Sequence, residues 1–299
     1  MTRSARACGV LAISVALVLT ACSSAGPEPA PTRTPAPVPS SPRPEPGPSY
    51  VAIGDSYTAG GLIGSFQPDG LLCQRSTENY PSLVAEALDL TLTDVSCGGA
   101  SSADVLQAGR GLPAQIDAVT EQSKVVTVSV GGNDFGLYGN LIGTCPNVSK
   151  PGAPGAPCRD LIATDVGSAI PAIGKKIGTV LDAVRTKAPR AEILVVGYPR
   201  LMPRSGTCKN APYAKGDLAW LSSVESDLSA AMASAAASAG VAFVPMHARS
   251  KGHDLCSGDA AWVNGLEPPT GDGAFLHPNA AGEKAMADAV AKELEKAGN

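Results

Sequence analysis

The chain has 299 residues and a formal net charge of −4, from 27 acidic and 23 basic side chains. Hydrophobic residues make up 44% of the chain and aromatic residues 4%, so a full core is available but must be built mainly from alanine, valine, leucine and isoleucine. The mild acidity and the lack of a basic run along the sequence argue against a nucleic-acid partner.

The first residues have the pattern of an export signal. Arg3 and Arg6 are followed by an apolar run over residues 9–20, which is too short for a comfortable membrane span and is typical of a signal peptide. The run ends in Leu19-Thr20-Ala21-Cys22, which resembles the bacterial lipobox. This resemblance implies that residues 1–21 are a lipoprotein signal peptide and that Cys22 is lipidated and becomes the mature N-terminus. The alternative is an ordinary signal peptide with a small-residue cleavage site.

The next segment, residues 22–48, begins with this cysteine and continues with mostly proline, serine, alanine and threonine. Such a composition cannot bury a core, so we predict a disordered, polyproline-like linker. At ~3.1 Å per residue, it could hold a domain up to roughly 80 Å from a membrane. The folded domain is therefore predicted to cover residues 49–299.

Six cysteines lie in this predicted domain: Cys73, Cys97, Cys145, Cys158, Cys208 and Cys256. An even number in an exported domain indicates disulfides, although the sequence alone does not select a pairing. The spacing favours Cys145–Cys158 and leaves Cys73–Cys97 and Cys208–Cys256 as the simplest remainder. A zinc site is the alternative, but the sequence has neither a Cys-x-x-Cys pair nor clustered histidines to support it.

Short β-branched runs alternate with longer amphipathic patterns along the domain. We predict strands at residues 50–53, 91–97, 124–130, 191–197 and 241–246, and helices at residues 80–90, 113–120, 165–187, 215–239 and 278–296. Residues 136–164 and 247–276 are predicted to be long loops. The alternation indicates an α/β fold, a three-layer α/β/α sandwich with a mostly parallel sheet of about five strands.

Three of the predicted strands lead into segments whose side chains or backbone N–H groups can carry chemistry. Right-handed crossovers would bring Ser56, Gly99 and Asn133 to one edge of the sheet, and His277 lies just before the last helix. Ser56 can act as a nucleophile with His277 as its base. The backbone N–H groups of Ser56 and Gly99 and the side-chain amide of Asn133 can form an oxyanion hole. We interpret Asp55 as a brace for the loop that carries Ser56.

These segments resemble the conserved blocks of the SGNH, or GDSL, hydrolases. Gly54-Asp55-Ser56-Tyr57-Thr58 is similar to the first block, with Tyr57 in place of the usual leucine, and Gly99-Ala100-Ser101-Ser102 is similar to the second. Gly131-Gly132-Asn133-Asp134 matches the third block, and Ala274-Phe275-Leu276-His277-Pro278 resembles the last. The resemblance implies a flavodoxin-like sandwich and a serine esterase or lipase. The six cysteines are similar to those of the secreted bacterial lipase/esterase branch, which implies the same three disulfides.

The last block departs from the family pattern, because Ala274 stands where the family often has the aspartate of a catalytic triad. Some members of the branch resemble this chain and use a backbone carbonyl instead. We therefore predict a Ser–His dyad in which the carbonyl of Ala274 accepts from His277 Nδ1. Asp272 is the alternative partner. Of the other two histidines, His247 is expected at the surface.

The sequence thus predicts a monomeric esterase or lipase, anchored to the extracytoplasmic face of a cell membrane through its N-terminal lipid. It would hydrolyse a small-molecule or lipid ester without a metal or an organic cofactor. One alternative is an acetyl esterase that acts on carbohydrate or on the cell envelope. The other alternative is a non-catalytic binding lipoprotein.

Overall fold

The computed structural model of the protein describes residues 47–204 and 206–297. The predicted signal peptide, Cys22 and nearly all of the predicted linker lie outside these residues, and their assignments stay predictions. Among the described residues, no helix is both long and apolar enough to cross a membrane.

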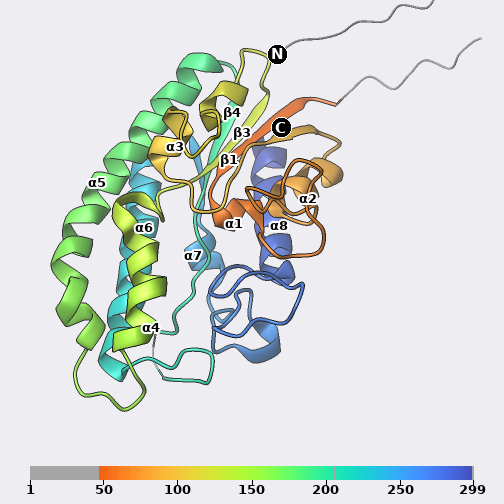
Figure 1. Ribbon diagram of the computed structural model, residues 1–299. Helices are drawn as coiled ribbons and strands as arrows, with labels where there is room; N and C mark the ends of the chain where they lie inside the picture. The colour runs from red at the N-terminus through yellow and green to blue at the C-terminus, as the bar shows by residue number, and fades with distance from the viewer. Residues whose placement is uncertain (1–46, 205, 298–299) are drawn as a thin grey trace, which may run out of the picture. The chain divides into compact units, whose positions relative to one another are not determined.

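The core of the domain is a five-stranded parallel sheet with the order β2-β1-β3-β4-β5 (Figure 1). The strands are β1 Ser49–Gly54, β2 Thr91–Asp94, β3 Val125–Ser129, β4 Glu192–Val196 and β5 Ala242–Val244. All of β3 and nearly all of β1 are buried, as expected for central strands covered on both faces. The chain crosses from β1 to one edge and from β3 to the other, so a crevice for ligands is expected between their carboxyl ends.

Alternate side chains of each strand face two separate helical layers. Val51 and Ile53 of β1 lie in a core with the helices α5 (Pro157–Lys187) and α6 (Lys215–Ser238). Tyr50 and Ala52 lie in a second core with the helices α2 (Tyr80–Ala87) and α8 (Ala280–Ala297). Figure 1 shows α5 and α6 on one side of the sheet and α2 and α8 on the other. This arrangement confirms the predicted α/β/α sandwich.

Several short helices complete the domain and lie mostly at the carboxyl end of the sheet. They are α1 Ser56–Ala59, α3 Ser102–Leu106, α4 Cys145–Val148, α7 Met246–Arg249, the 3₁₀ turns η1 Gln115–Ala118, η2 Asp134–Gly136 and η4 Gly258–Ala260, and the π-helical turn η3 Gly139–Thr144. The two long predicted loops, residues 136–164 and 247–276, therefore contain helical turns that the sequence reading missed. The helix predicted at residues 113–120 is only the short turn η1.

The two long helices at the predicted loops also start at different residues than expected. Helix α5 begins at Pro157 instead of residue 165, because proline suits a first helical turn and the buried carboxylate of Asp217 accepts the N–H groups of Cys158 and Arg159. Helix α8 begins at Ala280 instead of residue 278. There the side chain of Asn279 accepts the N–H of Gly282.

Three disulfides close the loops of the domain, and they are the expected pairs. Cys73–Cys97 joins the segment after α1 to the end of β2, Cys145–Cys158 joins α4 to α5, and Cys208–Cys256 joins two loops beyond β4 and β5. These bridges use all six cysteines of the domain. In the part of the chain that the structure describes, no group of three or more potential ligand side chains could hold a metal ion.

Candidate active site

Ser56 is the first residue of α1, which begins abruptly where β1 ends. Gly54 is held by Gln115, whose side chain accepts from the Gly54 N–H at 3.0 Å and donates to the Gly54 carbonyl at 2.9 Å. A Cβ at Gly54 would lie 2.0 Å from Thr58 Oγ1, so a side chain at this position would collide with the helix. Asp55 then caps α1 by accepting from the N–H of Tyr57 at 3.0 Å. The strand, the tight turn and the cap together fix the direction of the Ser56 hydroxyl.

His277 meets Ser56 across most of the length of the chain. His277 Nε2 lies 2.8 Å from Ser56 Oγ, although the two residues are 221 positions apart. The other ring nitrogen, Nδ1, donates to a backbone carbonyl at 2.8 Å, and this carbonyl belongs to Phe275. A hydroxyl, an imidazole and a carbonyl that orients the imidazole are thus in line, which is the geometry that a nucleophile and its base require.

The residue that orients His277 differs from both predictions. The carbonyl of Ala274 is instead near the side-chain amide of Asn264, at 3.4 Å. The carboxylate of Asp272 accepts the N–H of Ala280 at the start of α8, while His277 Nδ1 bonds to the Phe275 carbonyl. The Phe275 carbonyl can fold back onto the ring because the next residue, Leu276, has a left-handed backbone with φ 54°. The type of group was predicted correctly, but its position was wrong by one residue.

Tyr57, which stands in place of the usual leucine, joins α1 to residues 275–277, which we call the histidine turn. Its hydroxyl donates to the carbonyl of Leu276 at 2.7 Å, and its ring lies 4.7 Å from the His277 ring, centroid to centroid. The sequence shows the substitution at Tyr57 but did not predict this contact of its hydroxyl.

Gly99 and Asn133 lie with Ser56 and His277 in the lining of one cavity of about 540 Å³. Asn133 follows β3, and its side-chain amide donates to the carbonyl of Ala100 at 3.0 Å. Gly99 has a left-handed backbone with φ 73°, in the loop that follows β2. The four residues predicted to carry the chemistry therefore surround the same space.

A buried hydrogen-bond network that includes Asp55 and Tyr198 supports Asn133. Tyr198, at the end of β4, donates its hydroxyl to Asp55 Oδ2 at 2.5 Å and accepts the N–H of Gly132 at 3.0 Å. The amide of Asn133 is 3.5 Å from the same carboxylate oxygen. Asp55 is fully buried, and this desolvation raises its pKa to about 7. Asp55 thus braces the serine loop, as predicted, while the contribution of Tyr198 was missed.

The sequence of the domain matches one protein family along most of its length. Residues 52–285 match the GDSL-like Lipase/Acylhydrolase family. The chain belongs to this family. It is 36% identical over 247 residues to Lipase 2 of Streptomyces coelicolor, an alignment that covers 80% of this chain and 83% of that lipase. Among relatives of this kind the common activity is carboxylic ester hydrolysis, and this GDSL hydrolase is a carboxylic ester hydrolase.

Two solved structures share the fold of the GDSL hydrolase. Phospholipase A1 from Streptomyces albidoflavus NA297 superposes with a TM-score of 0.70 at 29% identity, covering 82% of this chain and 99% of that one. The extracellular lipase from Streptomyces rimosus also gives a TM-score of 0.70, at 30% identity, covering 82% of this chain and 98% of that one.

The environment of His277 in this GDSL hydrolase favours a neutral imidazole. Burial lowers the pKa of His277 below its ordinary value of 6.5, and the hydrogen bond to the Phe275 carbonyl offsets only part of this effect. At neutral pH the ring is therefore unprotonated and able to accept a proton from Ser56.

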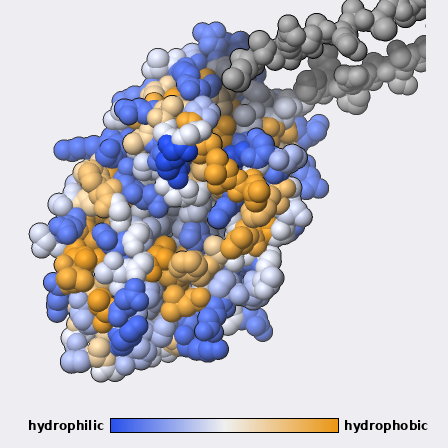
Figure 2. Space-filling view, in the orientation of Figure 1, coloured by the Kyte–Doolittle hydropathy of each residue, from blue (hydrophilic) through white to orange (hydrophobic). Residues whose placement is uncertain are grey.

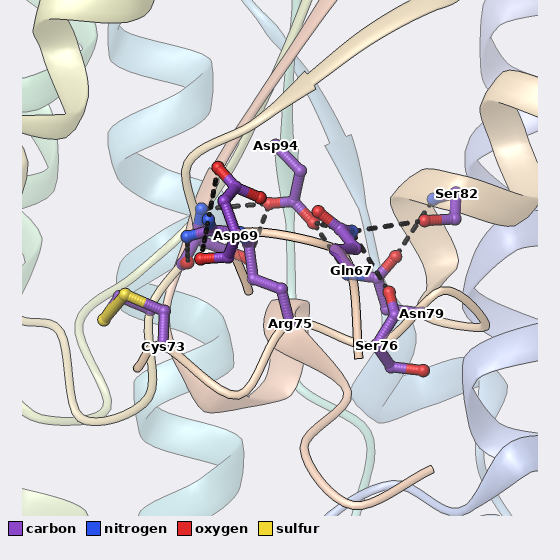
Figure 3. A network of polar contacts seen from close by, with 10 residues as sticks. Gln67, Asp69, Cys73, Arg75, Ser76, Asn79, Ser82 and Asp94 are labelled. Carbon is purple, nitrogen blue, oxygen red and sulfur yellow. Dashed lines mark hydrogen bonds and ion pairs between the residues drawn. A yellow bond between two sulfur atoms is a disulfide. The ribbon is translucent and has the colours of Figure 1, made fainter. Parts of the chain in front are cut away.

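One wall of the cavity of the GDSL hydrolase is held by a polar network at the end of β2 (Figure 3). Asp94 accepts from Gln67 Nε2 at 3.1 Å and from Asn79 Nδ2 at 2.7 Å. Arg75 pairs with Asp69 at 3.1 Å and donates to the Ser96 carbonyl at 3.2 Å. These bonds fasten residues 61–78, which contribute Leu62, Leu72 and Gln74 to the cavity.

Large apolar side chains are exposed at the mouth of this cavity. Leu62, Leu72 and Phe275 line it and are 48%, 73% and 49% exposed, and Leu71 beside them is 71% exposed. Figure 2 shows hydrophobic surface bordering a hollow on this face of the molecule. Exposed apolar groups that gather at one opening are typical of a binding site for an apolar partner.

Proposed function

We propose that Ser56 is the nucleophile of this hydrolase and His277 its general base. The contact of 2.8 Å between Ser56 Oγ and the partly buried imidazole of His277 is the observation that carries this proposal. The imidazole takes the hydroxyl proton as Ser56 Oγ attacks the ester carbonyl. His277 then gives this proton to the departing alcohol, which leaves an acyl group on Ser56. A water molecule, activated by the same base, releases the acid and restores the serine.

We propose the backbone N–H groups of Ser56 and Gly99 and the side-chain amide of Asn133 as the oxyanion hole. These groups line the same cavity as the nucleophile. Loss of one such donor lowers the rate of comparable enzymes by ~10²–10³-fold. The Phe275 carbonyl orients the imidazole and, being neutral, stabilises its protonated form less than a carboxylate would.

The apolar mouth favours an ester with an apolar acyl chain as the substrate. Leu62, Leu72 and Phe275 would lie along such a chain and remove its surface from water, at about 25 cal/mol per Å². The two similar solved structures are a phospholipase A1 and an extracellular lipase, which supports a lipid ester as the substrate. We therefore propose a lipase or long-chain esterase.

We further propose that the enzyme is exported and held at the outer face of a membrane by a lipid on Cys22. The three disulfides support export, because such bridges persist mainly outside the reducing cytosol. The lipobox-like sequence before Cys22 supports the lipid anchor. The domain would act as a monomer at the end of its Pro-rich linker.

Labelling with a fluorophosphonate tests the nucleophile directly. The protein should be labelled, Ser56→Ala should not be, and His277→Ala should be labelled far more slowly. Ser168→Ala, at an exposed serine of α5, is the matched control and should be labelled like the parent. Labelling that persists in Ser56→Ala would overturn the assignment.

A comparison of esters tests the substrate class. Hydrolysis of long-chain esters or phospholipids in preference to acetate esters supports the proposed lipase. Preference for acetylated sugars would identify an acetyl esterase instead.

For the anchor, mass spectrometry of the mature N-terminus from the native host should find acyl groups on Cys22, and Cys22→Ser should release the enzyme from the membrane fraction.

A further inference from the structure

A second cavity, apart from the catalytic one, lies where the segment after β4 meets α6 and α7. Its volume is about 430 Å³, and it shares no lining residue with the cavity at Ser56. Charged and hydroxyl side chains dominate its lining, which includes Arg200, Arg204, Ser222, Ser226, Asp227 and His247.

Arg200 is a buried arginine that makes few good hydrogen bonds. Only 8% of its surface is exposed. Its Nη1 lies 3.5 Å from Ser222 Oγ and its Nη2 lies 3.4 Å from the His247 carbonyl, both near the limit for a hydrogen bond. Its Nε has no partner among the described residues. Because buried guanidinium groups normally use most of their five N–H donors, these donors indicate a ligand that accepts them.

The nearby buried carboxyl group of Glu225 makes its hydrogen bonds to backbone groups and not to Arg200. Glu225 uses its oxygens to accept the N–H groups of Leu201 and Met202, at 3.2–3.3 Å. Burial raises the pKa of Glu225 to about 8, and the charge of Arg200 acts in the opposite direction. None of these hydrogen bonds goes to Arg200, so the Nε–H of Arg200 is left for another partner.

The cavity contains two further charged side chains, which are of opposite sign. Arg204 contributes a second guanidinium, and Asp227 contributes one negative charge. His247 is buried, contrary to the prediction that it lies at the surface. Burial and the two arginines lower the pKa of His247 to about 4, so it is neutral, and its Nε2 has no hydrogen-bond partner among the described residues. Two guanidinium groups, an imidazole, several hydroxyls and the one carboxylate of Asp227 therefore line one space.

We propose that this cavity binds an oxyanion of the phosphate type, held by the guanidinium groups of Arg200 and Arg204. The fork of an arginine matches two oxygens of a phosphate and is the usual partner for such groups in proteins. The hydroxyls of Ser222 and Ser226 can donate to the remaining oxygens. The phosphate can be a free ion or part of a lipid headgroup. This inference does not depend on the proposed catalytic residues.

Calorimetric titration with inorganic phosphate at constant ionic strength tests the site. The parent protein should bind phosphate, and Arg204→Ala should bind it roughly tenfold more weakly or worse, since a hydrogen bond to a charged group contributes about 1.5–3 kcal/mol. Arg190→Ala, at an exposed arginine before β4, is the matched control and should bind like the parent. No binding by the parent, or equal binding by Arg204→Ala, would overturn the proposal.

The role of Arg200 is best tested without replacing it, because a substitution of a buried arginine can prevent folding. Arginine Nε–H signals in a nitrogen–proton NMR spectrum meet this need, because only those groups that contact the anion should shift on addition of phosphate. The Arg200 signal should move, and it should stay in place in Arg204→Ala at the same phosphate concentration. A full set of unmoved arginine signals would contradict the site.

A vesicle assay distinguishes the two sources of phosphate. Vesicles of phosphatidylcholine with added phosphatidic acid should bind the protein more tightly than pure phosphatidylcholine if the ligand is a headgroup, and inorganic phosphate should compete. If phosphate binds in solution but the vesicles do not compete, the ligand is a free ion. Vesicle binding that Arg204→Ala leaves unchanged would exclude this cavity as the headgroup site.

Discussion

The hydroxyl of Tyr57 donates to the carbonyl of Leu276 at 2.7 Å, which joins two segments 219 positions apart. Tyr57 follows Ser56 directly, and Leu276 precedes His277. The bond therefore holds Ser56 and His277 close to each other through the residues adjacent to them. The same Tyr57 ring packs beside the imidazole, which further limits its rotation.

Removing this hydroxyl should loosen the histidine turn. We expect Tyr57→Phe to leave the buried Leu276 carbonyl without its donor and to lower the free energy of unfolding by about 1–3 kcal/mol. The turnover number for a p-nitrophenyl ester should fall by roughly tenfold, because small misplacements of a base are costly. Steady-state kinetics and thermal unfolding measure the two effects.

The control for this change is Tyr80→Phe, at a buried tyrosine whose hydroxyl lies 3.5 Å from Thr127 Oγ1 on the other face of the sheet. This substitution should leave the turnover number near that of the parent. If both variants lost activity equally, the Tyr57 hydroxyl would have no particular link to His277.

The pH dependence of the enzyme should reflect the partly buried imidazole of His277. A base must be unprotonated to accept a proton, so kcat/KM should fall as the pH drops through the pKa of His277. Since burial lowers this pKa, the midpoint of the acidic limb is expected below pH 6.5. A pH–rate profile on an uncharged ester checks this, and a midpoint clearly above 6.5 would contradict the environment described for His277.

The sequence predicted the five strands, the long helices and the residues that line the cavity, but it did not predict the short helical turns or the contacts that support the site. Ser56 and Asn133 could be identified because each follows a buried strand, and the ends of neighbouring parallel strands meet at one edge. The Phe275 carbonyl could not be selected over that of Ala274, because the choice depends on the backbone of Leu276. Tyr198 follows a predicted strand, and this position was the available signal for its contact with Asp55.

Asp272 should be dispensable for catalysis, since its carboxylate caps Ala280 at the start of α8. We expect Asp272→Ala to keep most of the kcat/KM of the parent while losing about 1 kcal/mol of stability through the missing cap. Kinetics and chemical denaturation separate the two effects. A loss of activity as large as that of His277→Ala would show that the carboxylate serves the histidine during turnover.

The exposed leucines at the mouth should matter for lipid surfaces more than for soluble esters. Leu71 is 71% exposed beside the cavity and does not line it. We expect Leu71→Ser to weaken vesicle binding by up to roughly tenfold, because partial burial of a leucine contributes less than the about 1.5–3 kcal/mol of full burial. Hydrolysis of a short soluble ester should stay unchanged. Cosedimentation with phosphatidylcholine vesicles measures the binding.

The matched control is Leu161→Ser, at a leucine of α5 that is 60% exposed. It is absent from the lining of the catalytic cavity, so this variant should bind vesicles like the parent. Equal losses in both variants would mean that the surface around the mouth has no special affinity for lipid.

The hydroxyl of Tyr198 should affect the rate of the chemical step through Asn133. Tyr198→Phe removes the donor to Asp55 and the acceptor for the Gly132 N–H, so both groups are left buried without that partner. We expect a loss of about 1–3 kcal/mol in stability, and a fall of roughly tenfold in kcat with little change in KM, as for a weakened oxyanion donor. Tyr213→Phe is the control, because the Tyr213 hydroxyl is buried but has no hydrogen-bond partner among the described residues. A rise in KM with unchanged kcat in Tyr198→Phe would instead assign Tyr198 to substrate binding.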